Sequence, residues 1–199
     1  MSEERSKPTR RLGREERRAQ LVAAAARSFM QAGFAATSLD DVAAAAGVTK
    51  AIIYRHFESK HDLYLAVLLD TRRRIRDHVR DPQLNPDTVA ELALAAREAP
   101  DGFRLLYRHA RREPDFADYV DELDTNARQT AETRLRERIP DPARRRWIAA
   151  LMAAVIFDAI LTWLDTDQPV EPDELARTLQ ATVRALTSAQ ASSAETPTS

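Results

Sequence analysis

The stretch from residue 37 to residue 60, TSLDDVAAAAGVTKAIIYRHFESK, constrains the fold of this chain more than any other. Ser38 stands three residues before Asp41, which is the spacing of a capping box, so a helix is predicted to begin there. Gly47 is predicted to end that helix, because glycine adopts a left-handed backbone conformation without steric cost. The stretch therefore opens with a short helix followed by a tight turn.

A second short helix is predicted directly after the turn. Thr49 is placed to cap it, and Ser59 with Asp62 repeats the capping-box spacing, so a third helix is expected to follow at once. Two short helices joined by a glycine turn form a helix-turn-helix, whose second helix can lie in the major groove of DNA.

The composition favours helices throughout the 199 residues, since glycine occurs four times and aromatic residues make up only 6%. Cysteine is absent, which excludes disulfides, thiolate catalysis and cysteine metal sites. The first apolar run begins at Leu21 and contains Arg27, so it does not read as a signal peptide. We expect a cytoplasmic protein.

Charge is distributed unevenly along the chain. Residues 1–80 hold 16 lysines and arginines against 10 acidic residues, whereas residues 81–199 hold 14 against 21. A basic first part suits a polyanion and an acidic remainder would be repelled by one, so binding to a polyanion is expected at one end of the protein.

Proline marks most of the later helix starts, where an acidic or amide residue precedes it. The predicted fold class is all-α, with about nine helices: a three-helix helix-turn-helix domain, a connecting helix, and a second helical domain. Outside residues 37–60, the helices are predicted at 14–32, 60–80, 86–98, 101–111, 114–138, 142–165 and 172–188.

The most apolar segment, residues 147–164, is interrupted by Asp158 and Thr162. A membrane span needs about 20 apolar residues and would avoid a carboxylate in its middle, so a buried helix is favoured. We expect the helices at about 142–165 and 172–188 to pair with those of a second copy in a four-helix interface.

The run from residue 18 to residue 65 resembles the N-terminal domain of TetR-family transcriptional regulators. It contains the elements F-x-x-x-G-F-x-x-T-S, D-x-A-x-x-A-G-V-T and Y-x-H-F-x-S-K in that order. The resemblance implies a homodimer that binds a palindromic DNA operator and is released by a small-molecule effector, as a repressor. We divide the chain into a basic arm (1–13), a DNA-binding domain (14–60), an effector-binding and dimerisation domain (61–188) and a disordered tail (189–199).

The resemblance places the DNA contacts on and around the second helix of the motif. Three of the positions have a plainer interpretation: Thr49 as a cap only, Tyr54 as mainly a packing residue, and His56 as a helix-end residue. The basic arm is either a solubilising segment or a contact to phosphates or the minor groove. The residues implied to contact DNA are Thr37, Thr49, Lys50, Ala51, Tyr54, Arg55, His56 and Lys60.

An effector pocket is expected in the second domain, though no motif defines it. Asp158 is its sharpest candidate, because a carboxylate in an apolar segment needs a partner such as Arg104 or Arg108, or anchors a ligand that carries a cation or a hydrogen-bond donor. The arginines at 72, 73, 74 and 76 are interpreted first as a solvated face. The predicted pocket residues are Phe103, Tyr107, Trp147, Leu151, Val155, Asp158 and Thr162.

No cofactor or metal is expected, since the four histidines lack ligand spacing, and no catalytic motif occurs. The alternative to a DNA-binding regulator is a helical protein-interaction module whose helix-turn-helix is purely structural. An enzyme would have to rely on Asp158 alone, so we expect none.

Overall fold

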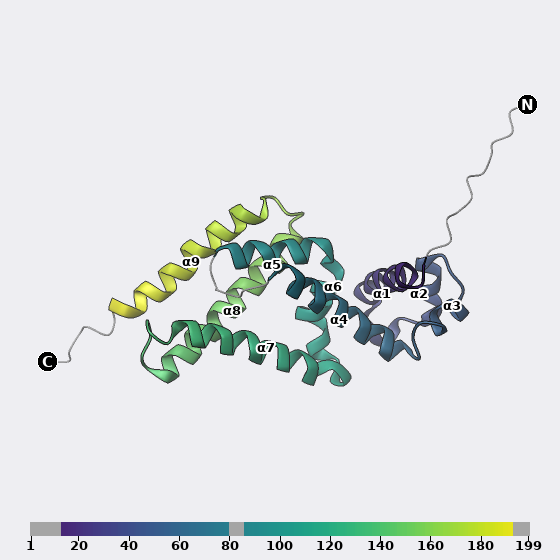
Figure 1. The fold of residues 1–199 in the computed structure, drawn as a ribbon, viewed down its shortest axis with the longest axis horizontal. Helices are drawn as coiled ribbons and strands as arrows, with labels where there is room; N and C mark the ends of the chain where they lie inside the picture. The colour runs from purple at the N-terminus through teal and green to yellow at the C-terminus, as the bar shows by residue number, and fades with distance from the viewer. Residues whose placement is uncertain (1–12, 80–85, 193–199) are drawn as a thin grey trace, which may run out of the picture. The chain divides into compact units, whose positions relative to one another are not determined.

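The computed structural model describes residues 13–79 and 86–192, which form nine α-helices and no strand (Figure 1). The all-α fold class predicted from the sequence is therefore confirmed. A π-helix, η1 (Leu105–His109), and a 3-10 helix, η2 (Ala110–Arg112), connect α6 to α7. The α-helices are α1 (Arg14–Ala36), α2 (Leu39–Ala46), α3 (Lys50–Tyr54), α4 (Lys60–His78), α5 (Pro86–Glu98), α6 (Pro100–Arg104), α7 (Pro114–Leu135), α8 (Pro142–Asp165) and α9 (Pro172–Ser192).

The chain divides into two compact units, Met1–Ala66 and Val67–Ser199. In the first unit, a small aromatic core joins α1 to the start of α4: the ring of Tyr64 lies 4.9 Å from that of Phe29 and 5.0 Å from that of Phe34. Phe29 and Tyr64 are almost fully buried. Phe34, which is partly buried, packs its ring against both of these side chains.

The first helix continues past the point where it was expected to end. It was predicted to stop before Gly33, but α1 runs to Ala36 with a break at Gly33, whose φ of 80° lies in the region that glycine tolerates best. The break turns the last residues of α1 so that the Phe34 ring reaches the core.

The helix-turn-helix forms as its local chemistry predicts. The Asp41 carboxylate accepts from the Ser38 backbone at 2.8 Å, and the Asp41 backbone donates to the Ser38 hydroxyl at 3.1 Å. Gly47 ends α2 with φ 65° and ψ 36°, and the Asp62 backbone donates to the Ser59 hydroxyl at 3.0 Å at the start of α4. Both capping interactions and the glycine turn are confirmed.

In the second unit, α5 packs along α9 and α7 packs along α8. As predicted, a proline is the first residue of α5, α7, α8 and α9. A core of buried side chains from α5, α8 and α9 includes Ile160, Leu161 and Trp163. The indole of Trp163 donates to the backbone oxygen of Val170 at 2.8 Å, which fixes the turn between α8 and α9.

Residues 100–112 differ from the single helix predicted at 101–111. They form α6, the π-helix η1 and the 3-10 helix η2 in succession. The Tyr107 ring in η1 lies 4.6 Å from Phe103 and is stacked 4.2 Å from Phe157 of α8. We attribute the wider π-turn to this packing, which local sequence does not reveal.

Three further helix ends differ from the predictions, the first being that of α4, which ends at His78 rather than at 80. α7 ends at Leu135 rather than at 138, and α9 continues through Ser192, so the first four residues of the expected disordered tail are helical. Residues 193–199 of that tail lie outside the described residues.

α8 is long and apolar enough to cross a membrane by length and composition, yet 44% of its most apolar window is already buried within this single chain. It packs in the core of the second unit through side chains such as Ile148, Ile156 and Ile160. Some of its apolar surface stays open, including Trp147, which is 55% exposed.

Candidate nucleic-acid interface and ligand cavity

The helix α3 is anchored by one face and open on the other. Ile53 is fully buried, whereas Lys50, Ala51 and Arg55 are exposed. Tyr54 is 54% exposed, which argues against a mainly packing role for its ring. The open face therefore offers a cation, a methyl group, a phenol and a guanidinium to a partner.

Lys50 is held by the preceding helix. Its Nζ lies 2.8 Å from the Asp40 carboxylate, and both side chains are largely exposed. The hydrogen bond to Asp40 raises the pKa of Lys50, so the side chain stays charged. Because an exposed pair of this kind is weak, a phosphate or a base edge can displace Asp40.

The two threonines at the helix starts behave differently. The Thr37 side chain is buried, and its hydroxyl donates to the backbone oxygens of Gly33 at 2.6 Å and Ser28 at 3.2 Å. The hydroxyl therefore stabilises the end of α1, and the DNA contact expected of Thr37 stays a prediction that would have to compete with these bonds. Thr49 is exposed at the N-cap of α3, and no side-chain capping bond forms, so the interpretation of Thr49 as a cap only is also wrong.

Lys60 has a structural role that the sequence did not reveal. Its Nζ donates to the backbone oxygens of Phe34 at 2.8 Å and Ala35 at 3.2 Å, and lies 4.6 Å from the centre of the Phe34 ring. These oxygens belong to the last turn of α1, whose carbonyls lack helical partners. Lys60 thus joins the end of α1 to the start of α4.

A cluster of cations surrounds His56. Partial burial lowers the pKa of His56, and the neighbouring charges of Arg14, Arg18 and Arg17, and then of Arg55, lower it further. His56 is therefore neutral at pH 7, where a neutral imidazole can still donate one hydrogen bond to a phosphate.

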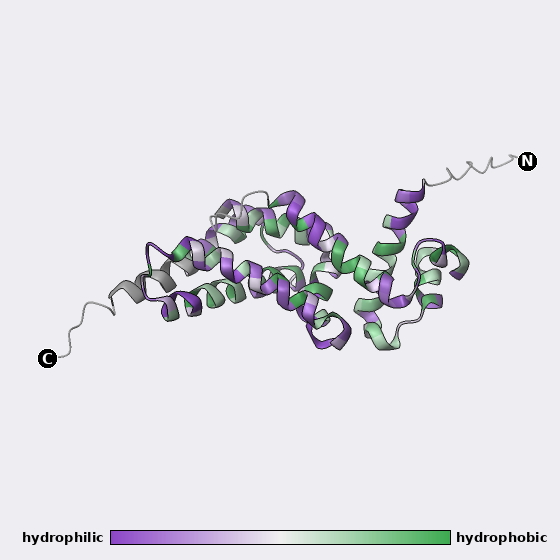
Figure 2. Ribbon diagram, turned by 60° about the horizontal axis from the view of Figure 1, so that its bottom comes forward, coloured by the Kyte–Doolittle hydropathy of each residue, from purple (hydrophilic) through white to green (hydrophobic). Residues whose placement is uncertain are grey.

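The three arginines of α1 in this cluster were not among the predicted contacts. They lie in its hydrophilic first turns (Figure 2) at positions 14, 17 and 18, a spacing that places them on one helical face. The guanidinium of Arg18 lies 5.0 Å from the centre of the Phe57 ring. The periodicity of charge in this helix could have identified them. The basic arm is not covered, because residues 1–12 lie outside the described residues.

The second unit contains a cavity of about 280 Å³ between α4, α5, η1, α7 and α8. Its walls are mostly apolar, with Ile75, Leu92 and Ile156 among the lining side chains. A neighbouring, more polar cavity of about 200 Å³ shares Tyr107 and Phe157 as lining residues. A mostly apolar cavity with a few polar groups is typical of small-molecule sites.

Only some of the predicted pocket residues line a cavity. Tyr107 lines both cavities and Asp158 lines the second. Phe103 is fully buried behind Tyr107, and Trp147 is exposed at the start of α8. The side chains of Leu151, Val155 and Thr162 lie outside the lining of both cavities.

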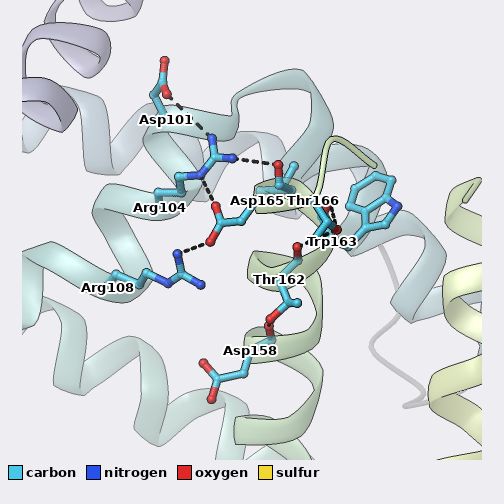
Figure 3. Close-up of polar contacts among 9 residues, drawn as sticks. Asp101, Arg104, Arg108, Asp158, Thr162, Trp163, Asp165 and Thr166 are labelled. Atoms are coloured by element: carbon cyan, nitrogen blue, oxygen red, sulfur yellow. Dashed lines mark hydrogen bonds and ion pairs between the residues drawn. The ribbon is translucent and has the colours of Figure 1, made fainter. Parts of the chain in front are cut away.

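The expected pairing of Asp158 with Arg104 or Arg108 is wrong. Both arginines bind Asp165 at the end of α8 instead, and Figure 3 shows no interaction between either of them and the Asp158 carboxylate. The hydrogen bonds from Arg108 and Arg104 lower the pKa of Asp165. Asp158 needs no buried partner, because its side chain is exposed in this chain.

Comparison with known proteins agrees with this architecture. Residues 21–67 match the family model described as bacterial regulatory proteins, tetR family. The HTH-type transcriptional activator FasR of Mycolicibacterium smegmatis is 34% identical over 174 residues, which cover 82% of this chain and 79% of FasR.

Solved structures share the fold. A TetR-like transcriptional regulator from Rhodococcus sp. RHA1 superposes with a TM-score of 0.74 at 22% identity, over 88% of this chain and 98% of that one. The transcriptional regulator FadR from Bacillus subtilis was solved in complex with stearoyl-CoA. It superposes with a TM-score of 0.62 at 16% identity, over 83% of this chain and 96% of the FadR chain.

Proposed function

Because the chain belongs to the TetR family of bacterial regulatory proteins and is a DNA-binding transcriptional regulator, we propose that it binds a palindromic operator as a homodimer and is released by a small-molecule effector. Bound to the operator it acts as a repressor. The observation that carries the proposal is the open face of α3, which presents Lys50, Tyr54 and Arg55 beside the arginine cluster of α1.

The side chains of this face suit the two kinds of contact that DNA offers. Lys50 can reach a phosphate or a guanine edge, and the Ala51 methyl can touch a thymine methyl. Tyr54, His56 and the exposed Thr49 hydroxyl can donate to phosphates. We assign Lys60 to the support of this face rather than to the expected phosphate contact, because backbone oxygens already engage its amine.

The homodimer is supported by the apolar surface that α8 leaves open. Trp147 is more than half exposed and Ala154 is also exposed, although α8 is long and apolar enough to cross a membrane by length and composition. A second copy would bury this surface and pair two recognition helices, as a palindromic operator requires.

The effector response is supported by the apolar cavity of the second unit, which has α4 as one wall. FadR, a neighbour in fold, was solved with stearoyl-CoA. A ligand that fills the cavity of this chain can bias the position of α4, which also carries the side chains Leu63 and Tyr64 into the core of the first unit.

Activation is the second candidate for the sign of regulation, because FasR, the 34% identical relative, is named a transcriptional activator. In vitro transcription from the promoter of the chain's own gene distinguishes repression from activation. Less transcript on adding the protein supports repression, and more transcript supports activation.

DNA binding at α3 is tested by gel shift with the gene's own upstream region, over a series of salt concentrations. We also assign the exposed Arg55 guanidinium to a phosphate. The substitution Arg55→Gln should therefore weaken binding to all sequences and reduce the salt slope by about 2 for a dimer, since each copy loses that contact. Arg112→Gln, an exposed arginine in η2 of the second unit, is the matched control. Equal slopes for both variants would favour the alternative, an interaction module that does not use this face for DNA.

We assign no catalytic role to the chain and place its action in the cytoplasm, where its DNA target would lie. Asp158, the one catalytic candidate from the sequence, is exposed on α8.

A further inference from the structure

Among the described residues that line the apolar cavity of the second unit, the charged ones are all of one sign. No carboxylate is among its described lining residues, and its charged groups are two arginines of α4. A bound cation would find no counter-charge there, whereas an anion would find two. Its polar and charged lining residues are Arg72, Arg76, Thr88, Tyr107, Asn126 and Thr130.

The four arginines of α4 at positions 72, 73, 74 and 76 differ in the groups that they bind. Arg73 and Arg74 bind the Asp70 carboxylate at 2.5 and 2.8 Å. Arg72 and Arg76 form no ion pair with any residue of the described ranges. Arg73 and Arg76 are exposed, as the interpretation of a solvated face requires. Arg73 and Arg74 share the Asp70 carboxylate, whereas Arg72 and Arg76 line the cavity without a counter-charge among the described residues.

Arg72 is the better placed of the two cavity arginines. It is half-buried, whereas Arg76 is exposed, and its guanidinium carbon lies 5.8 Å from the centre of the Tyr119 ring. The Tyr119 hydroxyl is buried, and none of the described residues accepts or donates a hydrogen bond to it. Tyr107, which lines the cavity, is close enough to both residues for their charges to influence the pKa of its phenol. This corner therefore gathers a guanidinium and two phenols, which are donors that an anion requires.

We propose that the cavity binds an amphipathic anion, with its apolar body against the aliphatic lining and its negatively charged group held by Arg72 and the Tyr107 hydroxyl. The inference rests on the proposed effector role of this cavity. A planar guanidinium suits carboxylate and phosphate oxygens, which it can bind through two parallel hydrogen bonds.

The size of the cavity limits the body of the ligand. At about 280 Å³, it holds roughly ten non-hydrogen atoms if each takes the ~30 Å³ that a water molecule occupies in the liquid. A ten-carbon chain is therefore a suitable test ligand. Its anionic group could be a free carboxylate or the phosphates of a thioester conjugate.

The test uses titration calorimetry of the full chain with four ligands of equal chain length: decanoate, decanol, decyltrimethylammonium and decanoyl-coenzyme A. We expect one of the two anions to bind at least tenfold more tightly than decanol, because hydrogen bonds to a charged group are the stronger ones. The cation should bind most weakly. Tighter binding of decanoate identifies a free acid as the source, and tighter binding of decanoyl-coenzyme A identifies the conjugate.

The variant Arg72→Gln should lose about tenfold in affinity for the preferred anion and nothing for decanol. Arg72→Lys should recover part of the loss, and Arg73→Gln, whose side chain binds Asp70 outside the cavity lining, is the matched control. Circular dichroism and thermal melting check that each variant is folded.

Three results would overturn the inference: equal binding of decanol and the anions, tighter binding of the cation, or an equal loss in Arg72→Gln and Arg73→Gln. Failure of all four ligands to bind would also overturn it. Gel shift measures operator binding and release on the same protein. A neutral compound that releases DNA would support the proposed function but contradict the inference that the ligand is an anion.

Discussion

The Thr37 hydroxyl is committed to the protein's own backbone, although its position before the helix-turn-helix suggests a phosphate contact. It donates to two carbonyl oxygens at the end of α1. Thr37→Val should therefore lower the free energy of unfolding by about 1–3 kcal/mol, because it leaves buried acceptors without their donor. Urea denaturation measures the change.

Thr37→Ser retains the hydroxyl and serves as the control for this position. In DNA-binding assays, Thr37→Val should leave the salt slope unchanged, since no phosphate contact is lost. A variant of unaltered stability with a shallower slope would show that the hydroxyl binds a phosphate after all.

His56 makes the stability of the first unit depend on pH. Burial and the neighbouring arginines hold the pKa of the folded histidine below its usual value of about 6.5. The unfolded chain therefore takes up a proton at higher pH than the folded chain does, so this residue's contribution to stability falls as pH decreases from about 6.5 through the folded pKa.

Comparing wild type with His56→Gln by urea denaturation at pH 7.5 and 5.5 isolates that contribution, because other groups titrate in both proteins. The wild type should lose more stability than the variant between the two pH values. Equal losses in both proteins would contradict the lowered pKa.

At the scale of elements, α4 and α6 approach closely at one glycine. A Cβ atom built on Gly102 would lie 2.2 Å from the Thr71 hydroxyl oxygen, which donates to the Val67 backbone oxygen at 3.0 Å. Gly102→Ala should therefore destabilise the protein by about 1–3 kcal/mol, even though alanine is the better helix former.

The double variant Gly102→Ala, Thr71→Ala tests this cause, because removing the hydroxyl makes room for the added methyl group. Its loss of stability should be smaller than the sum of the two single losses. Additive losses would show that the contact between α4 and α6 is not what Gly102 serves.

The elements themselves were largely predictable because their signals are local. Ser38 with Asp41, Gly47, and the prolines that begin α7 and α8 each act within one helical turn. Chain-distant contacts were not predictable in the same way. Lys60 binds a carbonyl 26 residues earlier in the chain, and Tyr107 in the π-turn packs on Phe157 of α8.

The candidate sites also differ in whether local sequence or contacts between distant residues determine them. Lys50, Tyr54 and Arg55 could be named as candidates from a motif, and the structure leaves all three exposed on the short helix. The ligand cavity could not be predicted from a motif, since five separate elements line it. Which arginine of α4 lines the cavity and which binds Asp70 depends on the direction in which each side chain leaves the helix.

At the scale of the whole molecule, the uneven distribution of charge and the proposed homodimer together determine how DNA is bound. The first unit, residues 1–66, carries 11 basic residues against 8 acidic ones, and the remainder carries 19 against 23. DNA should therefore bind only through the first unit of each copy, and specificity should need two copies, because one short recognition helix contacts few base pairs.

The most direct test of the account is a hydroxyl-radical footprint of the full chain on its own upstream DNA, with the mass of the complex measured by sedimentation. We predict two protected half-sites about 34–36 Å apart, or a multiple of that spacing, and two copies of the 22.4 kDa chain for each pair of half-sites. A single unpaired protected segment bound by one copy, or protection that does not distinguish this DNA from a scrambled sequence, would contradict the account.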